Sequence, residues 1–267
     1  MKKLLALLLA LCLPAGCAPK QLPEEELPAL TVIGVSQMGS ESGFRVANSQ
    51  SIHTTFTEEA GYRLLFEDAQ QKQDNQIAAI RKFIQQQVEC IVLMPLCVTG
   101  WDSVLEEAKA AGIPVILVDR TIQVEDESLY AAHIGSDFQW EGEQAVGWLE
   151  ETFRNTAGPV NILHIQGTLG SSAQLGRSAA LEKAIDRHEN WTLLARLNGD
   201  FIQAKTYEVT AQWLDSQPAP PEIHAVYCEN DNTAFGAIQA LEERGYTCGP
   251  KGVRIVSFDA TCQGLTY

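Results

Sequence analysis

Positive charge is scarce in this sequence, and the residue spacings that hold metal ions are missing. The 267 residues include 19 Lys and Arg against 34 Asp and Glu, for a formal net charge of -15. Such a chain repels phosphate backbones and anionic lipids, so nucleic acid is excluded as a partner. Among the five cysteines after Cys17, no two show the two- or four-residue spacing of zinc ligands, and no paired histidines follow them. We therefore expect no metal ion and no other cofactor.

The motifs of common enzyme classes are also missing. Residues 39–43 begin and end with glycine, but they lack the third glycine of a dinucleotide fingerprint and the Lys-Ser/Thr of a phosphate loop. No Gly-x-Ser-x-Gly nucleophile elbow occurs. The five histidines are scattered singly and are expected to be structural or exposed. The sequence therefore predicts no catalytic residues and no enzyme.

No apolar run has the length of about 18 residues that a membrane-spanning helix needs. The run Leu4–Leu13 follows a basic start and precedes Ala-Gly-Cys, which is the pattern of a lipoprotein signal peptide over residues 1–16. Cys17 is the predicted lipidation site. An ordinary signal peptide with an incidental cysteine is the alternative, because Pro14 stands where lipoprotein signals usually carry Leu. Residues 17–30, rich in Pro and Glu, are predicted to form a solvated tether.

These features predict an extracytoplasmic protein that is held at the membrane, or released into a periplasm, and touches lipid only through its anchor. Five cysteines remain beyond the lipid site, and an odd number leaves at least one unpaired thiol unless it pairs between chains. We interpret them as small hydrophobic residues and assign them no chemistry. They are Cys90, Cys97, Cys228, Cys248 and Cys262.

The body of the chain alternates apolar runs with segments of helical periodicity. A first series of strands is predicted at Thr31–Ser36, Tyr62–Phe66, Cys90–Met94 and Pro114–Val118. A second series is predicted at Asn161–Gln166, Thr192–Leu197, Ile223–Tyr227 and Val253–Phe258. Helices are predicted within Asn75–Val88 and near Gln139–Phe153, Ala173–His188, Gln203–Ser216 and Thr233–Arg244. Helical crossovers of this length imply parallel strands, so the predicted fold class is α/β with two Rossmann-like lobes.

Polar side chains follow many of the predicted strands. Ligands of open parallel sheets bind outside the carboxyl ends of the strands, which is where these residues should gather. Carboxylates, amides, guanidinium groups and an aromatic ring suit a polyhydroxylated ligand. Each residue has a structural alternative: the Asp residues as helix N-caps, the Arg residues as surface ion pairs, the Asn as a helix start. The set includes Glu41 to Arg45, Asp119, Arg120, Arg177, Asn230 and Asp259.

Together these residues resemble the periplasmic sugar-binding proteins of ABC importers, of the type I ribose/galactose-binding superfamily. The galactofuranose-binding branch is the most similar. The resemblance runs from about Thr31 to Asp259. It is carried by residues 35–45, 68–76, 95–101, 112–120, 166–170, 177, 199–201, 230–231 and 257–259.

The resemblance implies a two-lobed clamp, hinged by strand crossovers, that closes on one monosaccharide and delivers it to an ABC permease. It implies a monomer, with a first lobe at 31–134 plus 259–267 and a second lobe at 135–258. Phe201 is implied as a further aromatic wall. The implied ligand-binding residues are Glu41, Ser42, Gly43, Phe44 and Arg45 in a first-lobe loop, then Asp119, Arg120, Arg177, Asn230 and Asp259.

The chain departs from the family pattern in three places. Glu229 stands where the nearest relatives tend to show His, and Ala260-Thr261 replace the usual Gly after the last Asp. The family also continues beyond the position of Tyr267, so we expect the first lobe to be incomplete in these residues.

Alternative functions remain open to different degrees. A receptor that presents the bound sugar to a sensor kinase or chemoreceptor has the same pattern of residues. A glycosidase with Asp119 and Asp259 as acid and nucleophile is disfavoured but depends on a carboxyl separation that sequence does not show. Regulators of the lactose-repressor type share the lobes but begin with a helix-turn-helix, and a signal peptide occupies that position here, so a regulator is excluded.

Overall fold

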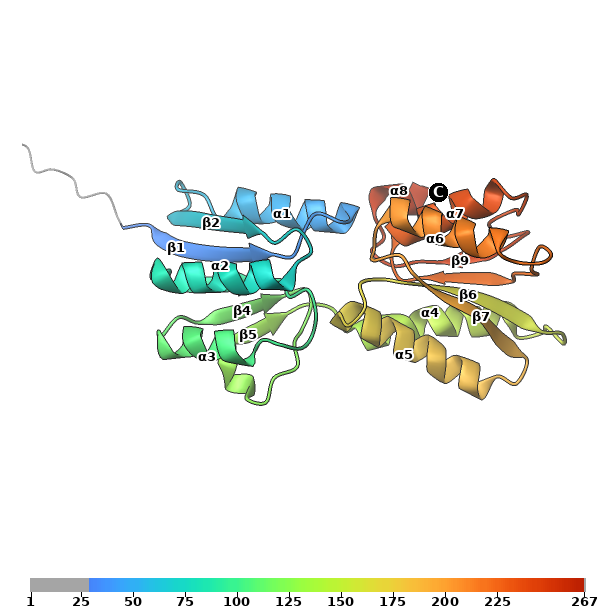
Figure 1. Ribbon diagram of the computed structural model, residues 1–267, viewed down its shortest axis with the longest axis horizontal. Coiled ribbons are helices and arrows are strands. Elements are labelled where there is room, and N and C mark those ends of the chain that lie inside the picture. Colours follow the sequence, from blue (N-terminus) through green and yellow to red (C-terminus); the bar gives the residue numbers. More distant parts are fainter. Residues whose placement is uncertain (1–28, 267) are drawn as a thin grey trace, which may run out of the picture.

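The computed structural model describes residues 29–266, which form two α/β lobes side by side (Figure 1). The first lobe comprises β1 (Thr31–Gln37), α1 (Gly43–Thr55), β2 (Tyr62–Asp68), α2 (Gln73–Gln85), β3 (Cys90–Leu93), α3 (Asp102–Ala110), β4 (Val115–Val118), η1 (Glu127–Leu129) and β5 (Ala132–Ile134). The second comprises α4 (Phe138–Phe153), β6 (Val160–Gln166), α5 (Ser172–Arg187), β7 (Trp191–Asn198), α6 (Gln203–Asp215), β8 (Ala225–Cys228), α7 (Asp231–Glu242), β9 (Arg254–Val256) and α8 (Cys262–Thr266). The predicted signal peptide, Cys17 and most of the predicted tether lie outside the described residues.

Each lobe is built on a parallel sheet. The first sheet has the order β2-β1-β3-β4-β5 and the second β7-β6-β8-β9, and every strand pair is parallel. The strand order reverses beside β1 in the first sheet and beside β6 in the second, and ligands of such sheets bind at these reversals. The prediction of two parallel α/β lobes is therefore confirmed.

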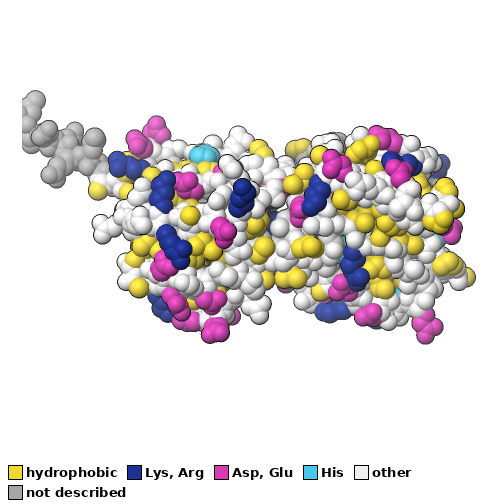
Figure 2. All heavy atoms as spheres, viewed as in Figure 1, with side chains coloured by type: hydrophobic (Ala, Val, Ile, Leu, Met, Phe, Trp, Pro, Cys, Tyr) yellow, Lys and Arg dark blue, Asp and Glu magenta, His cyan; other side chains and the backbone are white. Residues whose placement is uncertain are grey.

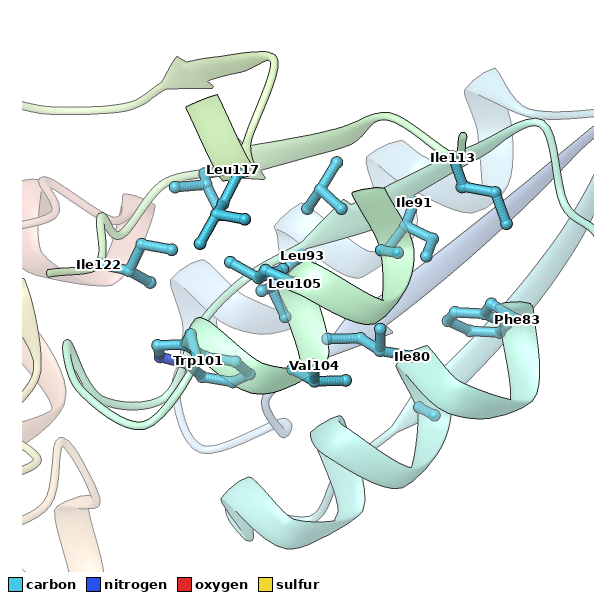
Figure 3. Close-up of a cluster of buried hydrophobic side chains, with 14 of the residues drawn as sticks. Ile80, Phe83, Ile91, Leu93, Trp101, Val104, Leu105, Ile113, Leu117 and Ile122 are labelled. Atoms are coloured by element: carbon cyan, nitrogen blue, oxygen red, sulfur yellow. The ribbon is translucent and has the colours of Figure 1, made fainter. Parts of the chain in front are cut away.

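The core of the first lobe shows why its sequence forms helices at these positions. Ile80 and Phe83 of α2 are fully buried against the sheet and against α3, among the side chains shown in Figure 3. The Phe83 ring packs so closely on β1 that a Cβ at Gly34 would lie 2.6 Å from it. Burying a side chain of this size stabilises the fold by roughly 1.5–3 kcal/mol. The apolar face predicted for this helix is thus the face that covers the sheet.

The second lobe is layered in the same way. Helices α4 and α5 pack on one side of its sheet with Val146, Leu149 and Leu181, and α6 and α7 contribute residues such as Leu214 and Leu241 to a second cluster. All five cysteines within residues 29–266 are free thiols. Their exposures differ: Cys228 is buried in the core, Cys262 is exposed, and Cys90, Cys97 and Cys248 lie between these extremes.

The chain passes from the first lobe to the second between β5 and α4. Near its other end, Thr261 donates hydrogen bonds from its backbone N–H and its hydroxyl to Asp231 of α7, both at 2.8 Å. Thr261 thus contacts the second lobe, and the assignment of 259–267 to the first lobe stays a prediction.

The visible face of both lobes carries positive and negative side chains mixed together, and the molecule narrows between the lobes (Figure 2). None of the helices within residues 29–266 is long and apolar enough to cross a membrane.

Candidate ligand-binding site

A cavity of about 360 Å³ lies between the lobes, which is within the size range of small-molecule sites. Both lobes contribute side chains from the carboxyl ends of their strands and the first turns of the following helices. Nine of the ten predicted residues line it: Glu41, Ser42, Phe44, Arg45, Asp119, Arg120, Arg177, Asn230 and Asp259. The lining is completed by Ser136, Phe138, Glu141, Ala173, Phe201 and Phe258.

The N-terminus of α1 forms one wall. Ser42 is its N-cap and accepts a hydrogen bond from the backbone N–H of Arg45 at 3.2 Å. The resemblance implied a loop over residues 41–45, and the structure corrects this for residues 43–45, which are the first turn of the helix. Gly43 does not line the cavity; its N–H donates to Asn232 Oδ1 of the second lobe at 3.1 Å. Phe44 lines the cavity, and 38% of this residue is exposed.

Arg45 organises the charges on the first-lobe side. It is only 2% exposed, and its Nη2 lies 2.5 Å from Asp119 Oδ2 while its Nε lies 3.4 Å from Glu41 Oε1. Arg45 Nη1 and Glu41 Oε2 are buried and have no hydrogen-bond partner among the described residues. Leaving buried polar groups unpaired costs free energy, so these two atoms mark a place where a polar ligand can compensate.

Arg120 joins the first lobe to the second. Its Nη1 donates to the carbonyl of Leu96 at 3.0 Å, and its guanidinium lies 5.1 Å from the centroid of the Phe201 ring across the cavity. Burial, followed by the nearby charge of Arg45, lowers the pKa of Arg120 to about 10. The side chain is therefore still a cation at neutral pH. It is 3% exposed, so the alternative of a surface ion pair does not apply.

Arg177 has the corresponding place in the second lobe. It is 5% exposed and holds Glu141 Oε2 at 3.0 Å from Nε and 2.8 Å from Nη2. Its guanidinium lies between two rings, 5.2 Å from the centroid of Phe138 and 4.5 Å from that of Phe258. A second acid, Asp259, has its Oδ1 3.7 Å from Arg177 Nη2. The aromatic rings and the acids fix the orientation of this cation on all sides.

Asp119 directly follows β4, and Asp259 comes three positions after the end of β9; both lie in the left-handed region, with φ of 67° and 89°. Non-glycine residues in this region are strained, and such strain is concentrated at functional sites. Burial raises the pKa of Asp259 to about 6, although Arg177 acts in the opposite direction. Asn230 caps α7 in a capping box with Thr233 and also lines the cavity, so its capping role does not remove it from the candidate site.

Sequence reasoning missed most of the second-lobe lining outside Arg177, Asn230, Asp259 and Phe201. Phe138 and Glu141 lie in the first turn of α4, immediately after the crossover, and their spacing was interpreted only as helix periodicity. Phe258 was assigned to a strand that in fact ends at Val256. A Phe-x-x-Glu pattern at the start of the helix that follows a crossover is the signal that was available.

The site holds four carboxyl groups and three guanidinium groups. Within residues 29–266, no group of three or more His, Cys, Asp or Glu side chains is arranged to hold a metal ion. The guanidinium groups are hydrogen-bond donors, the carboxylates are acceptors, and both lie next to aromatic faces. Such a lining matches a neutral ligand with many hydroxyl groups.

A family model described as a periplasmic binding protein domain matches residues 33–267. This chain belongs to the periplasmic binding protein family. The galactofuranose-binding protein YtfQ of Escherichia coli (strain K12) is 39% identical over 223 residues, which cover 84% of this chain and 69% of that protein.

Solved structures of similar proteins have the same fold. A crystal structure from Mycobacterium smegmatis in complex with β-D-fucofuranose has a TM-score of 0.83 at 40% identity and covers 89% of this chain and 76% of that one. The periplasmic binding protein component of the arabinose ABC transporter from Shewanella sp. ANA-3 was solved with α- and β-L-arabinofuranose bound. The match has a TM-score of 0.79 at 41% identity and covers 86% of this chain and 74% of that one. The ligands named for these three relatives are sugars.

Proposed function

We propose that this periplasmic binding protein captures one monosaccharide in its furanose form between the two lobes and delivers it to an ABC permease. The observation that carries the proposal is the cavity between the lobes, with a buried acceptor and a buried donor, Glu41 Oε2 and Arg45 Nη1, left without partners among the described residues. The furanose form is supported by the sugars of the three relatives, which are named as galactofuranose, fucofuranose and arabinofuranose.

In this proposal the three arginines donate to ring and hydroxyl oxygens, and the carboxylates of Glu41, Asp119 and Asp259 accept from sugar hydroxyls. The Phe44 and Phe201 rings cover the C–H faces of the sugar. Ser42 and Asn230 complete the polar contacts, and Gly43 contributes through the inter-lobe bond rather than through the ligand. We assign the first lobe to 31–134 plus 259–267 and the second to 135–258, and the protein acts as a monomer.

Calorimetric titration with galactose, arabinose, fucose and fructose tests the binding, and methyl pyranosides of the same sugars, which are locked in the six-membered ring, are the matched controls. We expect the free sugars to bind and the locked pyranosides to fail. The ring form of bound galactose labelled with ¹³C at C1 is then read by NMR. A bound pyranose would reject the furanose assignment, and no binding by any monosaccharide would reject the function.

Delivery to a permease is separated from presentation to a sensor kinase or chemoreceptor by uptake of labelled sugar. Deleting the gene for this chain should abolish uptake if it serves a transporter, whereas a pure sensor would leave uptake intact.

A glycosidase is tested by incubating the protein with aryl glycosides and measuring release of the aryl group. We expect no turnover, in line with relatives that are binding proteins.

The anchoring of this protein is also a proposal, because Cys17 lies outside the described residues. Cys17→Ser should move the protein from the membrane fraction to the released fraction and leave sugar affinity unchanged. Signal-peptide cleavage must be confirmed by mass, since an uncleaved signal itself holds protein at the membrane. A cleaved serine variant that stays in the membrane fraction would contradict the lipoprotein assignment.

A further inference from the structure

A fully buried carboxylate lies behind the binding cavity without lining it. Glu229, between β8 and Asn230, is 0% exposed. Its Oε1 lies 2.9 Å from His164 Nε2 and accepts from the Ser178 hydroxyl at 2.6 Å, and its Oε2 accepts from the backbone N–H of Gly167 at 2.7 Å. Taking a carboxylate out of water costs several kcal/mol, and only a full set of donors offsets such a cost.

Glu229 supports two walls of the cavity. Its backbone carbonyl accepts a hydrogen bond from Arg177 Nη1. Its side chain holds the N–H of Gly167, the residue on which the Phe201 ring rests, since a Cβ at Gly167 would lie 1.9 Å from that ring. The backbone of Glu229 therefore helps to position Arg177, and its side chain helps to position Phe201 through Gly167.

The same carboxylate is linked to the contact between the lobes. The hydroxyl of Ser178 accepts from the side-chain amide of Gln174 at 2.9 Å, and Gln174 Oε1 accepts from the N–H of Gly170 at 3.0 Å. The carbonyl of Gly170 then accepts from the N–H of Val98 in the first lobe at 2.9 Å.

A second inter-lobe bond lies at the end of the same segment, where Ser172 Oγ accepts from the N–H of Thr121 at 3.0 Å. Residues 167–172, which we call the interface segment, are thus anchored to Glu229 at one side and to the first lobe at the other.

We propose that Glu229 is a positioning residue that couples the second-lobe wall of the binding site to the inter-lobe contacts of the interface segment. This inference rests on the proposed function, in which the sugar is held between closed lobes. Glu229 touches no ligand. It holds Arg177, Phe201 and the interface segment in one arrangement, so that contact with the sugar and contact between the lobes are made together.

Glu229→Gln tests the proposal with almost no change in volume. An amide has one accepting oxygen where the carboxylate has two, so it cannot accept from Gly167, Ser178 and His164 together. We expect sugar affinity to fall about tenfold to a hundredfold, the range that follows from losing a charge-assisted hydrogen bond. The loss should lie in a faster dissociation rate with a nearly unchanged association rate, because the closed arrangement is weakened and the approach of the sugar is not.

The matched control is Glu182→Gln on the outer side of α5, where the carboxyl group is 48% exposed and pairs with Arg196 at 3.0 Å. Its affinity and dissociation rate should equal those of the wild type. Amide hydrogen exchange supplies a readout that needs no ligand: Gly167 and Gly170 should exchange faster in Glu229→Gln and not in the control. If wild-type and Glu229→Gln proteins bind sugar with equal affinity and dissociation rate, the inference is wrong while the proposed function stands.

A double-mutant cycle distinguishes coupling from general loosening. Ser172→Ala removes the bond to Thr121, and its effect on the dissociation rate should be smaller in the Glu229→Gln background than alone, because the interface segment is already released there. Strictly additive effects would overturn the coupling. If Glu229→Gln fails to fold, Ser178→Ala removes the same link to Gln174 with a smaller loss of folding stability. The dissociation rate of sugar from Ser178→Ala must then be faster than from the wild type for the proposal to survive.

Discussion

Asp119 serves the fold and the proposed ligand with the same carboxylate. Its Oδ2 lies 2.5 Å from Arg45 Nη2, and its backbone is held in the left-handed region just after β4. Asp119→Asn keeps the shape but halves the accepting capacity and removes the charge that orients Arg45. We expect sugar affinity to fall roughly tenfold to a hundredfold, measured by calorimetry. The exposed Asp186→Asn is the control, and an Asp119→Asn protein with unchanged affinity would remove this residue from the site.

Asp259 predicts opposite effects of pH on stability and on binding. Its pKa in the folded protein, about 6, lies above the ordinary 3.8, so the folded state favours the protonated form. The free energy of unfolding therefore has its full contribution from this group below about pH 4 and loses it as pH rises through about 6. At 1.36 kcal/mol per pH unit, up to roughly 3 kcal/mol is lost by neutral pH.

Asp259→Asn cannot ionise, so at pH 7 it should be more stable than the wild type by about 1–3 kcal/mol, with the difference vanishing near pH 4. Urea unfolding of both proteins at several pH values measures this difference. Subtracting the wild-type free energy of unfolding from that of the variant at each pH cancels the contributions of the other titrating groups. Equal free energies of unfolding of the wild type and Asp259→Asn at pH 7 would show that burial of the Asp259 carboxylate does not destabilise the folded protein.

The sugar affinity of the wild type should change in the other direction, because the carboxylate of Asp259 is the form that accepts hydroxyl hydrogens. Affinity should fall as pH drops below about 6, where Asp259 gains a proton. In Asp259→Asn the affinity should be lower at pH 7 and should lack this step. A wild-type affinity that stays constant between pH 5 and 7 would mean that Asp259 does not meet the sugar as a carboxylate.

The first turns of helices α1 and α7 are joined by a hydrogen bond between the lobes, from the N–H of Gly43 to Asn232 Oδ1. Asn232→Ala should leave the melting temperature of the sugar-free protein nearly unchanged and weaken sugar binding severalfold, since the bond contributes about 1 kcal/mol to the closed arrangement. Asn232→Asp keeps the acceptor at the positive end of α1 and should bind as well as the wild type. If the alanine variant binds as tightly as both, this bond contributes nothing to closure.

Strands and helices with a strong apolar pattern were predictable to within a few residues. The run Cys90–Met94 and the apolar face of α2 correspond closely to β3 and to the buried residues Ile80 and Phe83. Strand β5 was missed because its three residues are all exposed and form no apolar run. The start of α1 was missed because α1 is mostly polar, with only Arg45 and Ile52 buried.

The candidate site was predictable in part, because parallel strands bring their carboxyl ends together wherever the intervening helices lie. Within each sheet this rule gathers the residues that follow the strands, such as Asp119 in the first lobe and Asp259 in the second. It does not reach contacts between the lobes, such as that of Gly43 with Asn232, which are 189 positions apart in the chain. Nor does it reveal buried supports such as Glu229, whose side chain makes its hydrogen bonds behind the cavity.

The two lobes have separate sheets and separate cores, and they meet around the cavity. Without sugar we expect two overlapping unfolding transitions in calorimetry, because few contacts force the lobes to unfold together. Sugar at a hundredfold excess over its dissociation constant should stabilise the protein by about 2.7 kcal/mol and merge the transitions, since its contacts come from both lobes. A single two-state transition in the absence of sugar would contradict the independence of the lobes.

The order of the strands along the chain also sets an order in time. Within residues 29–266, the five strands of the first sheet lie in residues 31–134 and the four strands of the second lie in residues 160–256. A chain that is made from its N-terminus at about 5–20 residues per second can pair the first sheet before the strands of the second have been synthesised. The binding cavity needs side chains from both halves, Arg45 as much as Arg177. A ligand that needs both groups of side chains therefore cannot assist the pairing of these first-sheet strands, because the second-lobe part of the cavity is synthesised later.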